Sequence, residues 1–232
     1  MQEQKSSFPF SMVERMMPWY PGIAVMGWAF VLIAFFFAWF VLSPAQASFF
    51  SDAKAVREGA AAGSAFVSAN LASHVLETWL PHFKFFGLGL GLLAIVMALG
   101  TIAKRLRNMG VVIFSQLPEN MRPAIPAPPK RIRLFQFSAL MGIMVLMIVL
   151  IVGIVLAVGV VSGYWDNSIA NELNPAQPGS ALLSQLSVIS SYAFWLNPLR
   201  MIGMAFLFTG ITVALTVIIG TLRMQTKLLG GL

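Results

Sequence analysis

The chain has 232 residues, of which 58% are hydrophobic and only 10% are charged. Soluble domains carry about 25% charged residues, so this composition excludes an ordinary soluble fold and predicts an integral membrane protein. The net charge of +7 does not indicate nucleic-acid binding, because the basic residues flank apolar stretches and form no stripe on a soluble domain. The absence of cysteine excludes disulfides and thiolate metal sites.

Four apolar stretches without any charged residue follow one another along the chain. They are residues 22–41, 85–103, 134–161 and 201–221. A helix crosses the hydrocarbon core of a bilayer in about 20 residues, so each stretch is long enough to span it. Backbone groups in lipid must form hydrogen bonds within their own segment, which makes helices the expected form. The sequence therefore predicts an all-α integral membrane protein with four transmembrane helices.

The basic residues predict how these helices are oriented. Seven lie between the second and third stretches: Lys104, Arg105, Arg107, Arg122, Lys130, Arg131 and Arg133. Because cytoplasmic loops are rich in Lys and Arg, this side is expected to be cytoplasmic, with both termini there too. The expected location is the bacterial inner (cytoplasmic) membrane. Trp79, Trp165 and Trp195 then lie at the outer boundary, where amphipathic rings anchor helices.

The two halves of the chain resemble each other at a shift of 116 residues. Residues 63–107 align without a gap on residues 179–223, with 13 identical residues in 45 positions. Shared composition explains the Leu and Ile matches, but it explains poorly a repeated Gly-Ser-Ala triplet, a Trp-Leu pair and Lys84 opposite Arg200. We therefore predict a tandem duplication of a two-helix unit. Both units enter from the cytoplasm, so the repeat is parallel, a form that some transporters use.

This interpretation divides the chain into five parts. They are a cytoplasmic N-terminal segment (1–20), a first repeat (21–110), a cytoplasmic linker (111–133), a second repeat (134–226) and a cytoplasmic tail (227–232). The linker is rich in proline and basic residues, and proline favours extended structure. We interpret it as a semi-extended segment that lies against headgroups or a partner; a solvated tether is the alternative.

Each repeat is expected to consist of a transmembrane helix, an outer amphipathic helix and a second transmembrane helix. In the second repeat, four serines fall close to one face of a helix: Ser180, Ser184, Ser187 and Ser191. Apolar residues fall on the opposite face, which is the pattern of an amphipathic helix. Residues 180–196 are too few to span a membrane, so this helix is predicted to lie at the outer interface or to dip into the bundle.

Both histidines, His74 and His82, fall in the first outer segment and are expected near the outer face. His74 and Glu77 are spaced i, i+3, as metal ligands on a helix often are. Against a metal site, Pro81 is expected to interrupt the helix before His82. We treat His74, Glu77 and His82 as weak candidates for metal, and polar residues at a wet interface as the simpler interpretation. No catalytic residue and no cofactor is predicted, whereas bound lipids are expected.

Small residues provide candidate helix-packing faces, since they let helix backbones approach closely. The predicted packing residues are Gly87, Gly91, Gly203, Gly210 and Ala214. Ionisable residues at membrane depth usually mark ion paths or substrate sites. The four apolar stretches contain none, which argues against an ion-coupled pump.

Together these features predict a non-catalytic structural or assembly subunit of a larger multi-protein membrane complex, and not an enzyme. It would pack through small-residue helix faces and dock partners through its outer segments. The expected partners are other membrane-protein subunits and lipid, without nucleic acid, in a homo- or hetero-oligomer. Two alternatives remain. One is a channel or carrier for a small solute, and the other is the membrane anchor of a redox enzyme that binds haem, metal or quinone near His74 or His82.

Overall fold

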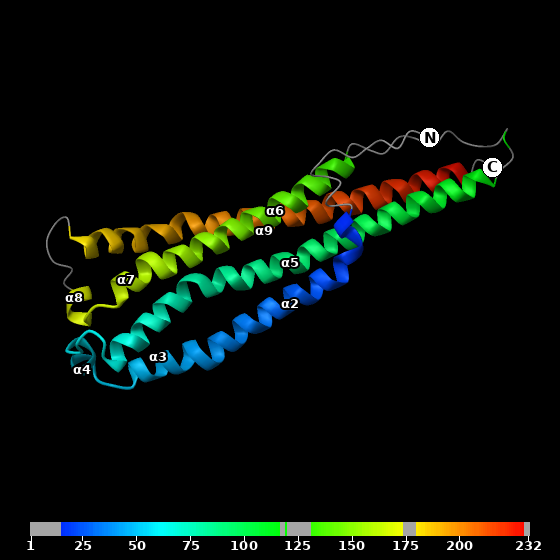
Figure 1. The fold of residues 1–232 in the computed structure, drawn as a ribbon. Helices are drawn as coiled ribbons and strands as arrows, with labels where there is room; N and C mark the ends of the chain where they lie inside the picture. The colour runs from blue at the N-terminus through cyan, green and yellow to red at the C-terminus, as the bar shows by residue number, and fades with distance from the viewer. Residues whose placement is uncertain (1–14, 117–118, 120–130, 174–179, 230–232) are drawn as a thin grey trace. The chain divides into compact units, whose positions relative to one another are not determined.

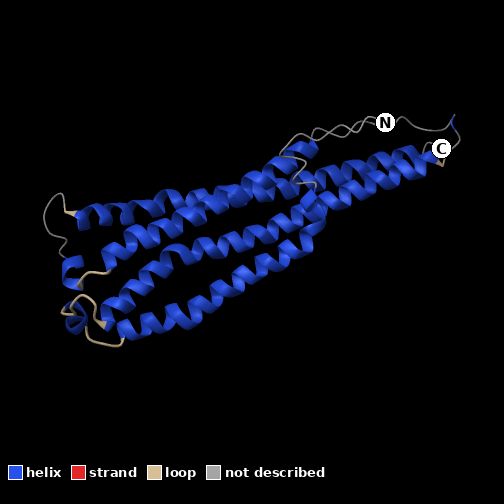
Figure 2. Cartoon of the chain, in the orientation of Figure 1, coloured by secondary structure: helices blue, strands red, loops and turns tan. Residues whose placement is uncertain are grey.

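The computed structural model describes residues 15–116, 119, 131–173 and 180–229. Within these residues every regular element is a helix (Figure 2). Four helical stretches are long and apolar enough to cross a membrane: Met17–Phe50, Ala65–Ser115, Arg131–Trp165 and Ala181–Lys227. Each contains one of the four predicted spans. The prediction of a helical membrane protein with four candidate spans is thus confirmed.

The first and third stretches each consist of several elements in one continuous run. The first contains a 3-10 turn, η1 (Met17–Trp19), then α2 (Tyr20–Phe37), the π-helical turn η2 (Ala38–Leu42) and α3 (Ser43–Phe50). The third contains α6 (Arg131–Leu156), the π-helical turn η4 (Ala157–Val161) and α7 (Ser162–Trp165). Each run therefore has one π-helical turn towards its C-terminal end, a feature that is rare in helices generally.

The second and fourth stretches are single, unusually long helices. Helix α5 (Ala65–Ser115) has 51 residues and α9 (Ala181–Leu229) has 49. At about 1.5 Å per residue each is roughly 75 Å long, well over twice the thickness of the hydrocarbon core. The prediction of separate outer amphipathic helices is wrong for both, since residues 181–196 form the first part of α9 and residues 65–84 belong to α5.

The expected break at Pro81 is also absent. Pro81 lies inside α5, and Pro198 lies inside α9. Proline removes one backbone hydrogen bond, but neighbouring helices and small local adjustments compensate for that loss in membrane proteins. The helix therefore continues through Pro81, and His82 belongs to the same helix as His74.

Serine caps explain why α5 and α9 begin where they do. The Ser64 hydroxyl accepts a hydrogen bond from the backbone N–H of Val67 at 3.4 Å, and the Ser180 hydroxyl accepts one from Leu183 at 3.2 Å. Gly63, just before the first cap, has a φ of +77°, which only glycine adopts easily. The repeated Gly-Ser-Ala triplet of the sequence is therefore a helix start at both places.

Short helices occupy the connections that precede α5 and α9, and the linker is described only at its ends. Helix α4 (Lys54–Glu58) precedes α5, and α8 (Ile169–Leu173) precedes α9. Because α5 extends to residue 115 and α6 begins at residue 131, both ends of the predicted linker are helical. Its five prolines (Pro118, Pro123, Pro126, Pro128 and Pro129) lie outside the described residues, as do positions 1–14 of the predicted N-terminal segment.

Figure 1 colours the long stretches in chain order from blue to red. The chain forms two compact units, and each contains parts of all four long stretches. Unit 1 comprises Met1–Gly27, Gly89–Met144 and Gly203–Leu232; unit 2 comprises Trp28–Leu88 and Val145–Ile202. Residues at most 1% exposed form the centre of each, such as Val96 and Ala139 in unit 1 and Val67 and Leu196 in unit 2. Both halves of the sequence contribute to each unit.

Candidate functional site

His74 and Glu77 lie close together in unit 2, as their spacing predicts, and Trp165 joins them. The His74 ring stacks on Trp165 with ring centroids 3.6 Å apart and planes inclined by 12°. Its Nδ1 atom lies 3.8 Å from Oε2 of Glu77. The other carboxylate oxygen of Glu77 accepts a short hydrogen bond from the side-chain amide of Gln46. The carboxylate and the imidazole are therefore both engaged by groups of the chain itself.

His82 occupies a separate place, packed against Gly153 of α6. The side chain is 4% exposed, and a Cβ atom added to Gly153 would lie 2.6 Å from its Cδ2. Gly153 is twelve residues, or about 18 Å of helix, from Trp165. The two histidines thus cannot hold one metal ion together. Among the described residues there is no group of three or more His, Cys, Asp or Glu side chains that could do so.

The surroundings of His82 lie deeper in the apolar part of the helices than the sequence suggested. Its neighbour Phe83 stacks on Phe30, with centroids 4.7 Å apart, and Phe30 is near the middle of the first predicted span. Gly153 lies inside the third predicted span, residues 134–161. The sequence predicted a position near the outer face, because His82 comes before the second apolar stretch and no other information on its position was at hand. Its packing partners instead place it level with the first and third spans.

Arg200 of α9 lies in the same part of unit 2. Its guanidinium carbon is 4.1 Å from the centroid of the Phe85 ring, within the range of a cation–π interaction. Two buried nitrogens here, Arg200 Nε and His82 Nδ1, have no hydrogen-bond partner among the described residues. Polar groups of this kind at membrane depth are expensive and usually functional.

A second polar cluster surrounds Glu172 of α8, and no pattern in the sequence indicated it. Glu172 is 6% exposed, and its Oε2 accepts a hydrogen bond from Asn70 at 3.3 Å. The Tyr164 hydroxyl donates to the backbone carbonyl of Glu172 at 2.9 Å. Burial raises the pKa of Glu172 to about 7, against the opposing effect of the Asn70 hydrogen bond. The cluster joins residues 102 positions apart, which only the fold brings together.

The predicted packing residues differ in how closely their neighbours approach. Four are buried: Gly87, Gly203, Gly210 and Ala214. Gly91 has no neighbouring atom within 4 Å of the place its Cβ would take. The closest approach to another backbone is at Gly142, where a Cβ would lie 2.9 Å from the backbone oxygen of Gly203 and 2.7 Å from Cγ of Leu207. Gly142 was not among the predicted packing residues, although it lies at the spacing of a helix face with Ser138.

The predicted tryptophan anchors have different surroundings. Trp79 is half-buried and packs against Phe37 and Phe83 with centroids 6.0 and 5.5 Å apart. Trp195 of α9 is 49% exposed, and Trp165 covers His74. Two of the three rings thus also take part in contacts between helices.

Comparisons of the chain with known protein families, with curated proteins and with solved structures give no match. Its function is therefore inferred from its own residues. Besides His74, Glu77 and Gln46, unit 2 offers two polar clusters. One contains a carboxyl group that changes charge near neutral pH, and the other holds an imidazole and a guanidinium in the apolar part of the helices.

Proposed function

We propose that the chain is a non-catalytic subunit of a larger multi-protein assembly in the cytoplasmic membrane of a bacterium. The observation that carries this proposal is the small buried fraction of the first helical stretch. Of the 18 residues that form its most apolar part, 11% are buried, whereas 44% are buried in the corresponding 18 residues of α5. Most of its surface is therefore free to contact another chain.

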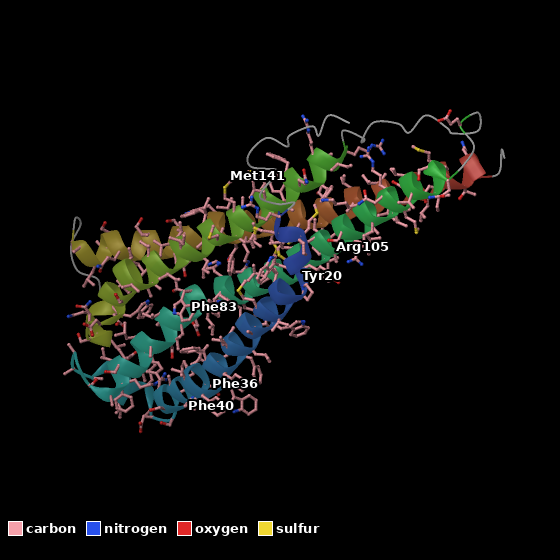
Figure 3. The ribbon with its side chains drawn as sticks, turned by 45° about the vertical axis from the view of Figure 1, so that its right-hand side comes forward. Tyr20, Phe36, Phe40, Phe83, Arg105 and Met141 are labelled. Atoms are coloured by element: carbon pink, nitrogen blue, oxygen red, sulfur yellow. The ribbon has the colours of Figure 1, made fainter. Side chains whose placement is uncertain are left out.

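The exposed side chains of this stretch form a regular stripe. It consists of Trp28, Leu32, Phe35 and Trp39, which are 68%, 50%, 52% and 61% exposed. Their spacing of four, three and four residues is that of the a and d positions at which helices interlock in a coiled coil. Figure 3 shows Phe36 and Phe40, which are 50% and 67% exposed, on the same helical stretch.

The aromatic content of the stripe supports a protein partner over lipid. Tryptophan in membrane proteins concentrates at the two boundaries with water. Trp28 lies well inside the predicted span, residues 22–41, and is still mostly exposed. Tryptophan is also enriched among the residues that contribute most to protein–protein binding. The proposed partner is therefore a transmembrane helix of another chain.

A photo-crosslinking residue introduced at Trp28 tests this directly. The matched control is the same residue at Phe30, whose ring packs within the chain against Phe83 and Phe86. We expect Trp28 to give a crosslink to a second membrane protein, identified by mass spectrometry, and Phe30 to give only intramolecular products. Adducts with lipid alone at Trp28, together with a monomer in mild detergent, would contradict the proposal.

The proposal includes a parallel duplication with both termini in the cytoplasm. Several features support it: serine caps begin both α5 and α9, each of these helices contains one proline, and the helical stretch before each contains one π-helical turn. A short helix precedes α5 and α9 alike. The orientation rests on the concentration of basic residues after the second span.

A second candidate is the membrane anchor of a redox enzyme, and the buried nitrogens of His82 and Arg200 favour it. The Nε–H of Arg200 is a donor suited to a carbonyl oxygen of a quinone ring at membrane depth, and the unpartnered Nδ1 of His82 is a second donor in the tautomer that carries its proton there. Purified protein should then retain extractable quinone that His82→Gln loses and His74→Gln keeps. Equal quinone content in both variants would remove this candidate.

The channel alternative has less support than the other two, because the threonines of α9 that could line a polar path are already hydrogen-bonded. The hydroxyls of Thr209, Thr212 and Thr216 each donate to a backbone carbonyl one turn earlier in α9, at 2.8 to 3.0 Å. All three residues are exposed on the surface of the chain. They therefore use their donors within their own helix, as threonines in membrane helices commonly do.

A further inference from the structure

A pocket of about 720 Å³ lies within unit 1, bordered by residues of α5, α6 and α9 and by Met17. Binding sites for small molecules commonly have volumes of about 300 to 1,000 Å³. Helix α5 forms the largest part of its wall, through Gly100, Lys104, Arg107 and Val111. These residues are three or four positions apart and therefore share one face of the helix.

Close packing closes one end of this pocket and holds its walls together. At Gly100 an added Cβ would lie 3.1 Å from Cε of Met17 and 3.2 Å from the Phe135 ring. Two residues after Lys104, the backbone oxygen of Leu106 accepts a hydrogen bond from the side-chain amide of Gln225 on α9 at 2.9 Å. The pocket is thus framed by direct contacts between the helices that line it.

The charges in the pocket are positive. Lys104 and Arg107 both line it, and none of the described lining residues carries a carboxyl group. Asn108 adds a neutral hydrogen-bonding group, whereas the Thr221 hydroxyl already donates to the backbone oxygen of Val217 at 2.9 Å. Two cations next to a neutral donor favour a ligand with several anionic oxygens, as in a phosphate group.

Gln136 gives an independent reason to expect an acceptor in the pocket. Its side chain lines the pocket, is 2% exposed, and its Nε2 has no hydrogen-bond partner among the described residues. Buried amide donors almost always have a partner in folded proteins. A ligand oxygen in this pocket would supply one.

The remaining wall is apolar, and the pocket lies where predicted spans end. Val111, Phe135 and Val217 contribute hydrocarbon surface. Lys104 and Arg107 directly follow the apolar stretch 85–103, and Gln136 lies at the beginning of the stretch 134–161. Basic pockets between helices at this level of a membrane suit anionic lipid headgroups.

We propose that this pocket binds an anionic phospholipid. Its phosphate lies between Lys104, Arg107 and the amide of Gln136, and its hydrocarbon part packs against Phe135 and Val217. This site is independent of the proposed role as an assembly subunit, because it uses unit 1 and none of the residues of the aromatic stripe on the first helical stretch.

Native mass spectrometry of the full chain in mild detergent tests the site with phosphatidylglycerol and phosphatidylcholine as probes. The double variant Lys104→Gln, Arg107→Gln should bind phosphatidylglycerol about tenfold or more weakly. The control is Arg105→Gln, which removes one positive charge from the same helix (Figure 3) at a residue that does not line the pocket. It should bind within about twofold of the unchanged chain. Equal binding of the two lipids, or an equal loss in the control, would overturn the proposal.

Thermal unfolding of the variant Gln136→Met, with and without lipid, distinguishes a role of the amide in binding lipid from a role in the fold alone. Removing an unpaired buried donor should raise the melting temperature without lipid and reduce the increase that phosphatidylglycerol causes. A lower melting temperature without lipid would show that the amide already has a partner, and would count against the site. The same measurement is repeated with inorganic phosphate in place of lipid. If phosphate raises the melting temperature as phosphatidylglycerol does, the ligand is a soluble phosphate and the lipid assignment is wrong.

Discussion

The ring of His82 occupies the space that Gly153 leaves by having no side chain. A Cβ atom at position 153 would lie 2.6 Å from Cδ2 of His82, closer than real Cβ contacts allow. Helices α5 and α6 thus meet here through an imidazole ring packed on bare backbone. The contact holds an ionisable ring, 4% exposed, level with two of the predicted spans.

Gly153→Ala should therefore destabilise the protein. The added methyl group must displace the His82 ring, and such overpacking costs about 1–3 kcal/mol. The control is Gly159→Ala in the same helical run, where an added Cβ meets no atom within 4 Å. Thermal unfolding in detergent should show a lower melting temperature for the first variant only.

The combination of His82→Ala with Gly153→Ala tests whether the ring is the cause. Removing the ring should relieve the clash, so the two substitutions together should cost less than the sum of the separate costs. Contacting residues typically show coupling of about 0.5–3 kcal/mol in such a cycle. Additive effects would mean that Gly153→Ala acts through some other neighbour.

Gly142 and Gly91 should respond very differently to the same substitution. At Gly142 the new Cβ would lie 2.9 Å from the backbone oxygen of Gly203, which cannot move aside as a flexible side chain could. Gly142→Ala should lower stability by about 1–3 kcal/mol. Gly91→Ala meets open space and should be neutral or stabilise the helix by up to about 1 kcal/mol. A similar loss of melting temperature in both would contradict the packing described.

Glu172 should make stability depend on pH in a defined direction. Its pKa is raised from 4.5 to about 7 in the folded protein, so between these values the folded state holds a proton that the unfolded state releases. This contribution is fully present below about pH 4.5 and is lost as the pH rises through about 7. Glu172→Gln, which keeps an acceptor for Asn70, should raise stability at pH 8 by up to about 3 kcal/mol.

Melting temperatures at pH 5 and pH 8 check this prediction. The difference between the two values should shrink in Glu172→Gln. The control Asp166→Asn removes an exposed carboxyl group close by in the sequence and should leave the difference in place. An unchanged pH dependence in Glu172→Gln would assign the effect to other groups.

The predicted orientation can be tested with single cysteines, because the chain has none of its own. With both termini in the cytoplasm, Asp52→Cys should react with a membrane-impermeant maleimide on intact cells. Gln116→Cys should react only after the membrane is opened. The unchanged chain should give no label, and the reverse pattern would show the opposite orientation.

The four spans could be predicted because the information for them is local. A charged residue in hydrocarbon is costly, so the ends of charge-free stretches indicate helices of sufficient length. The same reasoning failed at Pro81, where a rule derived mainly from soluble helices predicted a break. The missing hydrogen bond of one proline is a small loss within a helix of 51 residues that packs against its neighbours.

The site was less predictable from the sequence. The i, i+3 spacing of His74 and Glu77 correctly placed both on one side of a helix, and their atoms lie 3.8 Å apart. No local pattern indicated that Trp165 covers His74 or that Asn70 binds Glu172, since these pairs come from different helices. Gln136 looked like one polar residue at the edge of an apolar stretch, and only its neighbours show it to be buried without a partner.

By itself the sequence determined the class of protein and the number of its candidate spans. Composition and charge-free length act within one segment of the chain and need no partner. The tertiary structure alone decided that Gly142 approaches Gly203, that His82 faces Gly153, and that Lys104, Arg107 and Gln136 border one pocket. Those contacts depend on how helices distant in sequence are rotated and shifted against one another, which is set by side-chain packing across the whole unit.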